Sequence, residues 1–178
     1  MTKPISPIPI SQAYRFCPQC GAESQPISGG PFRCPQCSFT QFFGPVAAVG
    51  ALVVDDQNRL LLLRRARDPG QGMLGLPGGF VDPGETIEEA LRRECTEETN
   101  LQIQQADLLV SFPNRYEYHG LVSPVIDLFY VCTVQDVTAI ELQVAEVDQY
   151  HWVLPGEEPL DQMAFESNRR AIELFRAG

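Results

Sequence analysis

Residues 79–101 read GFVDPGETIEEALRRECTEETNL, and this stretch carries the strongest indication of fold and chemistry in the chain. Its second half predicts a helix on which Glu94, Glu97 and Glu98 share a face, because residues three and four apart lie on the same side. Like charges at this spacing destabilise an isolated helix by roughly a few tenths of a kcal/mol per pair. A bound divalent cation would offset that repulsion.

The apolar side of the same helix indicates where these carboxylates point. Ile87, Ala90 and Leu91 form the stripe that is expected to face the core, and Glu94 and Glu98 continue it. Inward-facing carboxylates suit a cation that prefers oxygen ligands, such as Mg²⁺ or Mn²⁺. The alternative is a solvated, glutamate-rich helix with an arginine partner.

This stretch resembles the signature of the Nudix hydrolases, Gx5Ex7REUxEExGU, in which U is a bulky aliphatic residue. Cys95 replaces an aliphatic residue and is expected to pack as a small hydrophobe. Asn100 replaces the last glycine, and because Asn tolerates the left-handed conformation, the helix is still expected to end there. The positions that match are Gly79, Glu85, Arg93, Glu94, Glu97, Glu98 and Leu101.

The resemblance implies a metal site and a hydrolytic activity. Nudix hydrolases cleave a nucleoside diphosphate linked to another moiety, giving a nucleoside monophosphate and a phosphorylated remainder. The implied cofactor is Mg²⁺ or Mn²⁺, and the pair Arg93–Glu85 is expected to orient its ligands. Those implied ligands are the carboxylates of Glu94, Glu97 and Glu98 and the carbonyl of Gly78.

The resemblance leaves the general base and the number of catalytic metals open. Glu94 corresponds to a position that is often proposed as the general base in this family. Other members take the base from a later loop, where Glu141 and Glu146 are the candidates in this chain. The alternative for each of these two residues is an ordinary loop acid.

Two CxxC pairs precede the Nudix-like region. Four thiolates in this arrangement predict a closed tetrahedral site for a structural Zn²⁺, with no ligand position open for catalysis. A segment this small builds little core, so metal binding would supply much of its folding free energy. Two disulfides are the alternative. The cysteines concerned are Cys17, Cys20, Cys34 and Cys37.

These features predict an α/β fold, a Nudix-type mixed β-sheet sandwiched between helices, with a small N-terminal zinc ribbon. We expect an N-terminal tail over 1–13, the ribbon over 14–43 and the Nudix domain over 44–178. Val46–Val54 is predicted as a buried strand with Leu60–Arg65 as its hairpin partner, and Ala164–Phe175 as a closing amphipathic helix.

The substrate is less well indicated. A zinc ribbon joined to a Nudix domain resembles NADH pyrophosphatases, but their SQPWPFPxS motif is replaced by residues 111–116, SFPNRY. The segment SFPNRYEYHG, residues 111–120, loosely resembles a region of some ADP-ribose and FAD pyrophosphatases. Phe112, Tyr116 and Tyr118 are candidates for stacking on a base, with core or edge-strand packing as the alternative. Arg64 and Arg65 are candidates for phosphate contacts.

We therefore expect hydrolysis of ADP-ribose, FAD or NADH. The alternatives are a hydrolase of nucleoside triphosphates or capped RNA ends, and a sensor that binds nucleotides without cleaving them. The net charge of −10 argues against a nucleic-acid partner, because binding to the phosphate backbone requires positive charge. The sequence shows no signal peptide or membrane-length apolar run, which predicts a cytoplasmic protein, and the family suggests a homodimer.

Overall fold

The computed structural model describes residues 6–27 and 29–178. The described chain divides into two compact units. The smaller contains the described residues up to Val46 together with Arg115–Val125, and the larger contains Ala47–Asn114 and Ile126–Gly178. The first five residues of the predicted tail, and residue 28 of the predicted ribbon, lie outside the described part.

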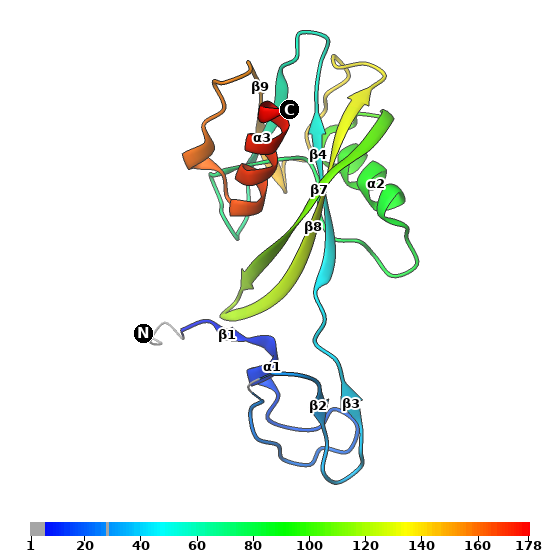
Figure 1. The fold of residues 1–178 in the computed structure, drawn as a ribbon, viewed down its shortest axis with the longest axis vertical. Helices are drawn as coiled ribbons and strands as arrows, with labels where there is room; N and C mark the ends of the chain where they lie inside the picture. The colour runs from blue at the N-terminus through cyan, green and yellow to red at the C-terminus, as the bar shows by residue number, and fades with distance from the viewer. Residues whose placement is uncertain (1–5, 28) are drawn as a thin grey trace. The chain divides into compact units, whose positions relative to one another are not determined.

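The larger unit contains two β-sheets and two long helices, which lie on opposite sides of the sheets (Figure 1). In one sheet, β8 pairs with β4 and with β7; in the other, β5 lies between β6 and β9. The predicted arrangement of mixed sheets between helices is confirmed. The strands are β4 (Val46–Val53), β5 (Leu60–Arg65), β6 (Leu74–Gly75), β7 (Ile103–Tyr118), β8 (Leu121–Val134) and β9 (Val147–Val153). The helices are α2 (Ile87–Thr99), the short 3₁₀ helix η1 (Leu160–Gln162) and α3 (Glu166–Ala177).

Strand β5 separates the two hydrophobic cores of the larger unit. Its four leucines are each at most 1% exposed, and they alternate between the two faces of the strand. Leu61 and Leu63 pack in the cluster that includes Ala90 and Leu91 of α2. Leu60 and Leu62 pack in the cluster that includes α3. A strand buried on both faces explains why its sequence is continuously apolar.

The predicted hairpin between β4 and β5 is wrong. The two strands meet only at one bridge, Val54 to Leu60, before the chain passes into the second sheet. The reason is that both edges of β4 have other partners. One edge pairs with β8, and the other makes backbone hydrogen bonds with the glycine-rich loop, in which the N–H of Val49 donates to the carbonyl of Gly79 at 2.9 Å.

The smaller unit has little regular structure. Strand β1 (Ile8–Pro9) pairs in parallel with the part of β8 at Leu121–Val122, so this part of the expected tail is ordered. It is followed by α1 (Ile10–Ala13), and β2 (Phe32–Arg33) then pairs with β3 (Thr40–Gln41). Its buried cluster is formed by Phe32 and two cysteines, Cys17 and Cys34.

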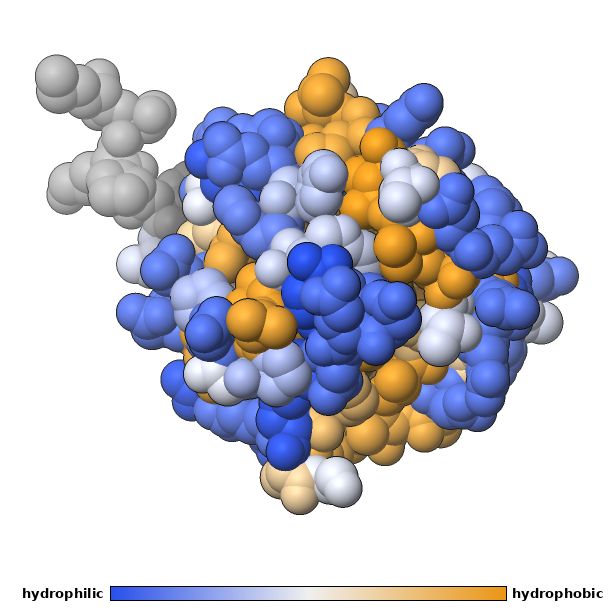
Figure 2. Space-filling view, turned by 90° about the horizontal axis from the view of Figure 1, so that it is seen from above, coloured by the Kyte–Doolittle hydropathy of each residue, from blue (hydrophilic) through white to orange (hydrophobic). Residues whose placement is uncertain are grey.

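No helix in the described part of the chain is long and apolar enough to cross a membrane. Hydrophilic side chains cover much of the face shown in Figure 2, with apolar patches between them.

Candidate active site

Helix α2, which carries most of the predicted site, is fixed at both ends. At its start, Thr86 Oγ1 accepts from the backbone N–H of Glu89 and the Glu89 carboxylate accepts from the N–H of Thr86, which is a capping box. At its end, Asn100 adopts the left-handed conformation with φ of 61°, which is the role predicted for it. The sequence contained the T-x-x-E signal of the capping box, which our sequence reasoning missed.

Two glycines before α2 allow its carboxylates to approach the backbone. Gly78 has φ of 147°, and a Cβ there would clash with the carbonyl oxygen of Val49. A Cβ at Gly79 would lie 2.5 Å from the carboxylate of Glu94. Because any side chain would displace either the loop or the carboxylate, both positions require glycine.

Glu98 and Glu94 face this glycine loop from the inward side of α2. Glu98 is 6% exposed, and its Oε2 accepts a hydrogen bond of 2.9 Å from the N–H of Gly78. The side chain of Glu94 is 15% exposed. Glu97 differs, since its side chain is 52% exposed. The structure thus turns two of the three predicted metal ligands inward and leaves the third at the rim.

Arg93 joins the acidic residues into one network. Its Nε donates to Glu85 at 2.6 Å, and its Nη1 donates to Glu94 at 2.8 Å and to Glu97 at 3.2 Å. Its Nη2 also donates to the carbonyl of Phe80 at 3.0 Å. These bonds hold the pKa of Glu85 down at about 2 and raise that of Arg93. The predicted Arg93–Glu85 pair is present and also restrains two of the metal-ligand candidates.

The electrostatics of the inner carboxylates suit a cation. Burial raises the pKa of Glu98 to about 8. The charges of Glu94 and Glu146 also raise this pKa, whereas the hydrogen bond from Gly78 lowers it. Burial also raises the pKa of Glu94, despite its contact with Arg93. Buried carboxylates that lack enough positive charge are stabilised by a hard divalent ion. The chemistry of these oxygen donors suits the predicted Mg²⁺ or Mn²⁺, although among the described residues only the four cysteines bring three or more ligand atoms within 4.8 Å of one another.

The two loop acids proposed as alternative bases occupy different surroundings. Glu146 acts electrostatically on both Glu94 and Glu98, and its carboxylate is paired with Arg67. Glu141 is exposed, and its backbone N–H donates to Thr99 O at 3.0 Å. Glu146 is thus the loop acid that belongs to the same charged group as the α2 carboxylates.

The predicted substrate-binding residues do not form one group. Arg65 lies near Glu98 and acts on its charge, and its guanidinium stands 5.1 Å from the ring centre of Phe165. Arg64 instead forms a bidentate ion pair with Asp148, in which Nε donates to Oδ1 at 2.7 Å and Nη2 donates to Oδ2 at 2.8 Å.

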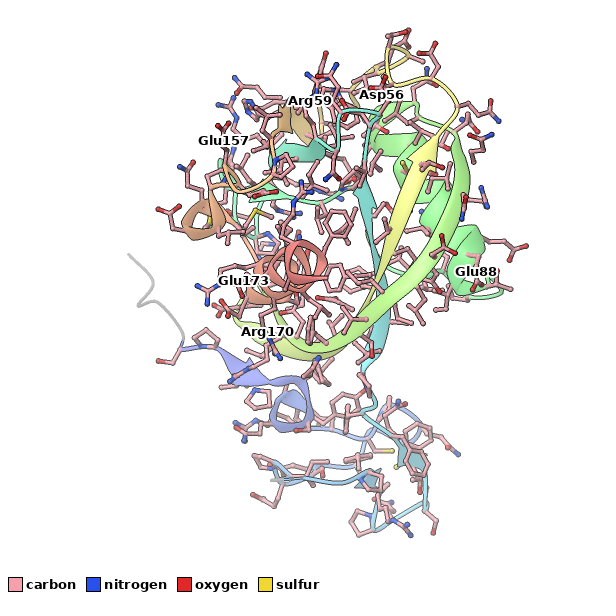
Figure 3. All side chains as sticks on the ribbon, turned by 45° about the horizontal axis from the view of Figure 1, so that its top comes forward. Asp56, Arg59, Glu88, Glu157, Arg170 and Glu173 are labelled. Atoms are coloured by element: carbon pink, nitrogen blue, oxygen red, sulfur yellow. The ribbon has the colours of Figure 1, made fainter. Side chains whose placement is uncertain are left out.

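The aromatic candidates are divided between the two units. Phe112 packs against the core that includes α3, and the guanidinium of Arg170 lies 4.0 Å from its ring centre. Figure 3 shows Arg170 on α3. Tyr116 and Tyr118 belong to the smaller unit, where their ring centres are 6.4 Å apart. Only Phe112 therefore shares a unit with the acidic network, and one of its faces is covered.

The predicted zinc ligands come together within the smaller unit. The sulfur atoms of Cys17, Cys20, Cys34 and Cys37 all lie within 4.8 Å of one another. Hydrogen bonds from the backbone N–H groups of Cys37 and Gln36 lower the pKa of Cys34 to about 6, whereas burial and the neighbouring thiols raise the pKa of Cys20 and Cys37. Four crowded thiols that compete for negative charge are stabilised as thiolates by a shared cation. This geometry and chemistry fit a tetrahedral Zn²⁺.

Comparisons with known proteins agree with this geometry. The NUDIX domain model matches residues 44–175. The chain is 43% identical over 76 residues to the ADP-ribose pyrophosphatase of Methanocaldococcus jannaschii, covering 42% of this chain and 44% of that protein. It is 30% identical over 171 residues to the NAD-capped RNA hydrolase NudC of Chromobacterium violaceum, covering 92% of this chain and 60% of that protein. The chain thus spans less than two thirds of the length of these relatives.

Solved structures show the same fold. A NUDIX hydrolase from Nitrosomonas europaea aligns with a TM-score of 0.67 at 22% identity, covering 92% of this chain and 90% of that one. The NUDIX domain of Shewanella oneidensis NrtR, crystallised with ADP ribose, aligns with a TM-score of 0.63 at 25% identity, covering 76% and 90%. Because the family model spans most of the chain, this protein belongs to the Nudix hydrolase family.

Proposed function

We propose that this protein is a metal-dependent pyrophosphohydrolase that cleaves ADP-ribose, FAD or NADH into AMP and a phosphorylated remainder. The observation that carries the proposal is the pair of buried carboxylates, Glu94 and Glu98, held against the backbone of Gly78 and Gly79. A protein that needed these residues only for folding would have little reason to bury two acidic groups beside each other.

Each residue of the network has a role in this proposal. Glu94, Glu97 and Glu98 would hold the cation together with the carbonyl of Gly78. When bound, the cation would neutralise the diphosphate and lower the pKa of the attacking water. Arg93 would keep the carboxylates of Glu94 and Glu97 in position, while Glu85 fixes the guanidinium.

We assign the general base to Glu146, with Glu94 as the alternative. The carboxylate of Glu94 is bound by Arg93 at 2.8 Å and is a proposed metal ligand, whereas Glu146, although paired with Arg67, lies on a separate loop and is not a proposed ligand. A base on a separate element can accept the proton of the water without leaving the cation. Glu146→Gln would then lower kcat with little effect on metal affinity, whereas Glu94→Gln would lower both.

The substrate class is supported by the names of the relatives. The archaeal relative is named an ADP-ribose pyrophosphatase and the NrtR domain was crystallised with ADP ribose. We assign the phosphate contact to Arg65, whose charge acts on Glu98. NAD-capped RNA is a second candidate because several relatives are named as hydrolases of it, although the acidic net charge of −10 disfavours a long RNA partner.

Product analysis tests the proposal. The protein would be incubated with Mg²⁺ or Mn²⁺ and ADP-ribose, FAD, NADH, NAD-capped RNA and nucleoside triphosphates, with Glu97→Gln as the inactive control. Glu97 is exposed, so this substitution should leave folding intact. AMP released from ADP-ribose, FAD or NADH is the expected result. Cleavage of nucleoside triphosphates alone would show that the substrate belongs to that class instead. Tight binding of ADP-ribose without turnover would show that the protein is a sensor.

A further inference from the structure

The backbone of Glu146 is fixed where β9 begins beside the end of β5. The carbonyl of Glu146 accepts a hydrogen bond of 2.7 Å from the N–H of Ala66, which follows the last residue of β5. The next residue, Val147, is 3% exposed and pairs with Arg65. Because the charge of Arg65 acts on Glu98, this pairing attaches Glu146 to the strand that borders the acidic network.

A bulge lies in the pairing of β5 with β9 directly after Glu146. The register shifts between Arg64 and Arg65, which leaves Asp148 as an extra residue in β9. Arg64 holds this extra residue by two hydrogen bonds, at 2.7 and 2.8 Å. A bulge bends its strand and redirects the side chains beside it, and bulges are common next to active sites. The turn that carries Glu146 is therefore anchored by a bent and ion-paired strand.

The side chain of Glu146 is repelled by the acidic network. Glu94 and Glu98 carry the same charge as Glu146, which acts electrostatically on both of them. Like charges repel more strongly where burial limits their screening by water. The side chain of Glu146 is 29% exposed, so a turn toward solvent would relieve this repulsion. A positive charge on Glu146 is needed to oppose that movement.

Arg67 supplies this positive charge. Its Nη2 pairs with Oε2 of Glu146, and in the described part of the chain this is the ion pair that Glu146 makes. The side chain of Arg67 is 60% exposed, so it reaches Glu146 from the surface and not from among the buried carboxylates. The contact is made to Oε2 and leaves Oε1 to accept a proton from water.

We propose that Arg67 is a positioning residue that holds the carboxylate of Glu146 near Glu94 and Glu98. This inference rests on the proposed function, in which Glu146 accepts the proton of the attacking water. Arg67 acts through Glu146 and touches neither the diphosphate nor the cation. Its loss should therefore lower kcat and leave KM and the affinity for Mg²⁺ nearly unchanged.

Steady-state kinetics with ADP-ribose and Mg²⁺ test this role. Arg67→Gln should lower kcat about tenfold or more, because a displaced base loses part of the roughly 100- to 10,000-fold that general-base catalysis contributes. Its KM should stay within about twofold of the wild type. Arg67→Lys keeps the positive charge and should recover part of the loss. Arg169→Gln is the matched control, because it breaks an exposed Arg–Glu pair on α3 and should leave kcat unchanged.

A double variant separates positioning from direct contact with the substrate. Arg67→Gln added to Glu146→Gln should cause no further loss of kcat, because the residue through which Arg67 acts is already altered. A further loss in the double variant would show that Arg67 contacts the substrate. A KM raised about tenfold in Arg67→Gln, or a weaker Mg²⁺ affinity by calorimetry, would show that Arg67 supports binding instead. Each of these results would overturn the inference.

Crystal structures of the wild type and of Arg67→Gln, without substrate, test the same point without turnover. The carboxylate of Glu146 should stay near Glu94 in the wild type and turn away from it in the variant. An unchanged Glu146 in Arg67→Gln would contradict the inference even if the wild type cleaves ADP-ribose. If the wild type cleaves none of the proposed substrates, the proposed function is wrong, and the two structures still decide whether Arg67 positions Glu146.

Discussion

Glu98 occupies a position where a neutral side chain would suit the folded state better than a carboxylate. It is 6% exposed, and its neighbours Glu94 and Glu146 carry the same charge. Glu98→Gln can keep the hydrogen bond from Gly78 through its amide oxygen. We predict that this variant is at least as stable as the wild type without metal but loses 100-fold or more of kcat/KM, as expected when a cation ligand is removed.

Thermal unfolding with and without Mg²⁺ checks this prediction together with the activity assay. The wild type should be stabilised by Mg²⁺ and Glu98→Gln should not, because a ligand stabilises only the state that binds it. Glu88→Gln, on the exposed side of α2, is the matched control and should respond to Mg²⁺ like the wild type. A Glu98→Gln variant that remains active, or that unfolds much more easily without metal, would contradict the prediction.

Asp55 supports the turn between β4 and β5 and should make stability depend on pH. Its Oδ1 accepts from the N–H groups of Gln57 and Arg59 at 3.0 and 2.7 Å, and its Oδ2 pairs with the Arg59 guanidinium at 2.6 Å. Although burial alone would raise the pKa of Asp55, these bonds lower it. Its stabilising contribution is therefore complete above the unfolded value of about 3.9 and is lost as the pH falls through the lower folded value.

We predict that Asp55→Asn lowers the free energy of unfolding by about 1–2 kcal/mol at pH 7, because the charge-assisted bonds are weakened. The difference from the wild type should shrink as the pH falls below about 3.9, because the Asp55 carboxyl of the unfolded chain then takes up a proton before that of the folded protein does. Urea unfolding of both proteins at pH 7 and pH 3 measures this. A constant difference at both pH values would show that Asp55 acts by shape alone.

Individual residues were predictable where a local rule applied to them. The inward direction of Glu94 and Glu98 followed from their continuation of the apolar stripe on α2. The partners of Arg64 and Arg65 were not predictable, because neighbouring residues on a strand point to opposite faces and the sequence does not say what each face meets.

The C-terminal end of α2 gives a prediction about a secondary-structure element. Asn100 has φ of 61°, and its Nδ2 also donates to the carbonyl of Ala139 at 3.2 Å. Asn100→Ala should cost about 1–2 kcal/mol, because alanine is strained in the left-handed conformation. Asn100→Gly, the residue of the family signature, should stay within about 0.5 kcal/mol of the wild type, since relief of strain offsets the lost hydrogen bond. Denaturant unfolding of both variants measures these free energies. An equal loss of stability in the two variants would assign the effect to the missing hydrogen bond with the Ala139 carbonyl and not to backbone strain.

Elements were predicted more reliably than their pairing. The four leucines of β5 indicate a strand buried on both faces, but not which strands lie beside it. The predicted hairpin failed because the glycine-rich loop takes the edge of β4 that β5 would have used. The pairing of this loop with β4 also brings Gly78 and Gly79 to the carboxylates of α2. A loop that binds a strand edge through its backbone has no side-chain pattern from which the contact can be inferred.

The two units of the described chain depend on different sources of stability. The larger unit has two hydrophobic clusters, whereas the buried cluster of the smaller unit consists of Phe32, Cys17 and Cys34. Such a small core offers little hydrophobic stabilisation, so the four cysteines should supply the rest by binding metal. We predict one Zn²⁺ per chain, measured by elemental analysis of the purified protein, and its loss in Cys17→Ser.

Removal of zinc should affect the two units unequally. A strong chelator, or Cys17→Ser, should abolish hydrogen-exchange protection around β2 and β3 while protection in β5 and α2 persists, because the latter lie in a core without cysteine–metal contacts. Cys95→Ser changes a buried thiol of that core and should leave the zinc content unchanged. Protein without zinc in which mass spectrometry finds two disulfides among the four cysteines would contradict the prediction. Their sulfur separations of 3.6 Å for Cys17–Cys37 and 3.7 Å for Cys20–Cys34 exceed the S–S bond of about 2.05 Å, as expected for thiolates around a shared ion.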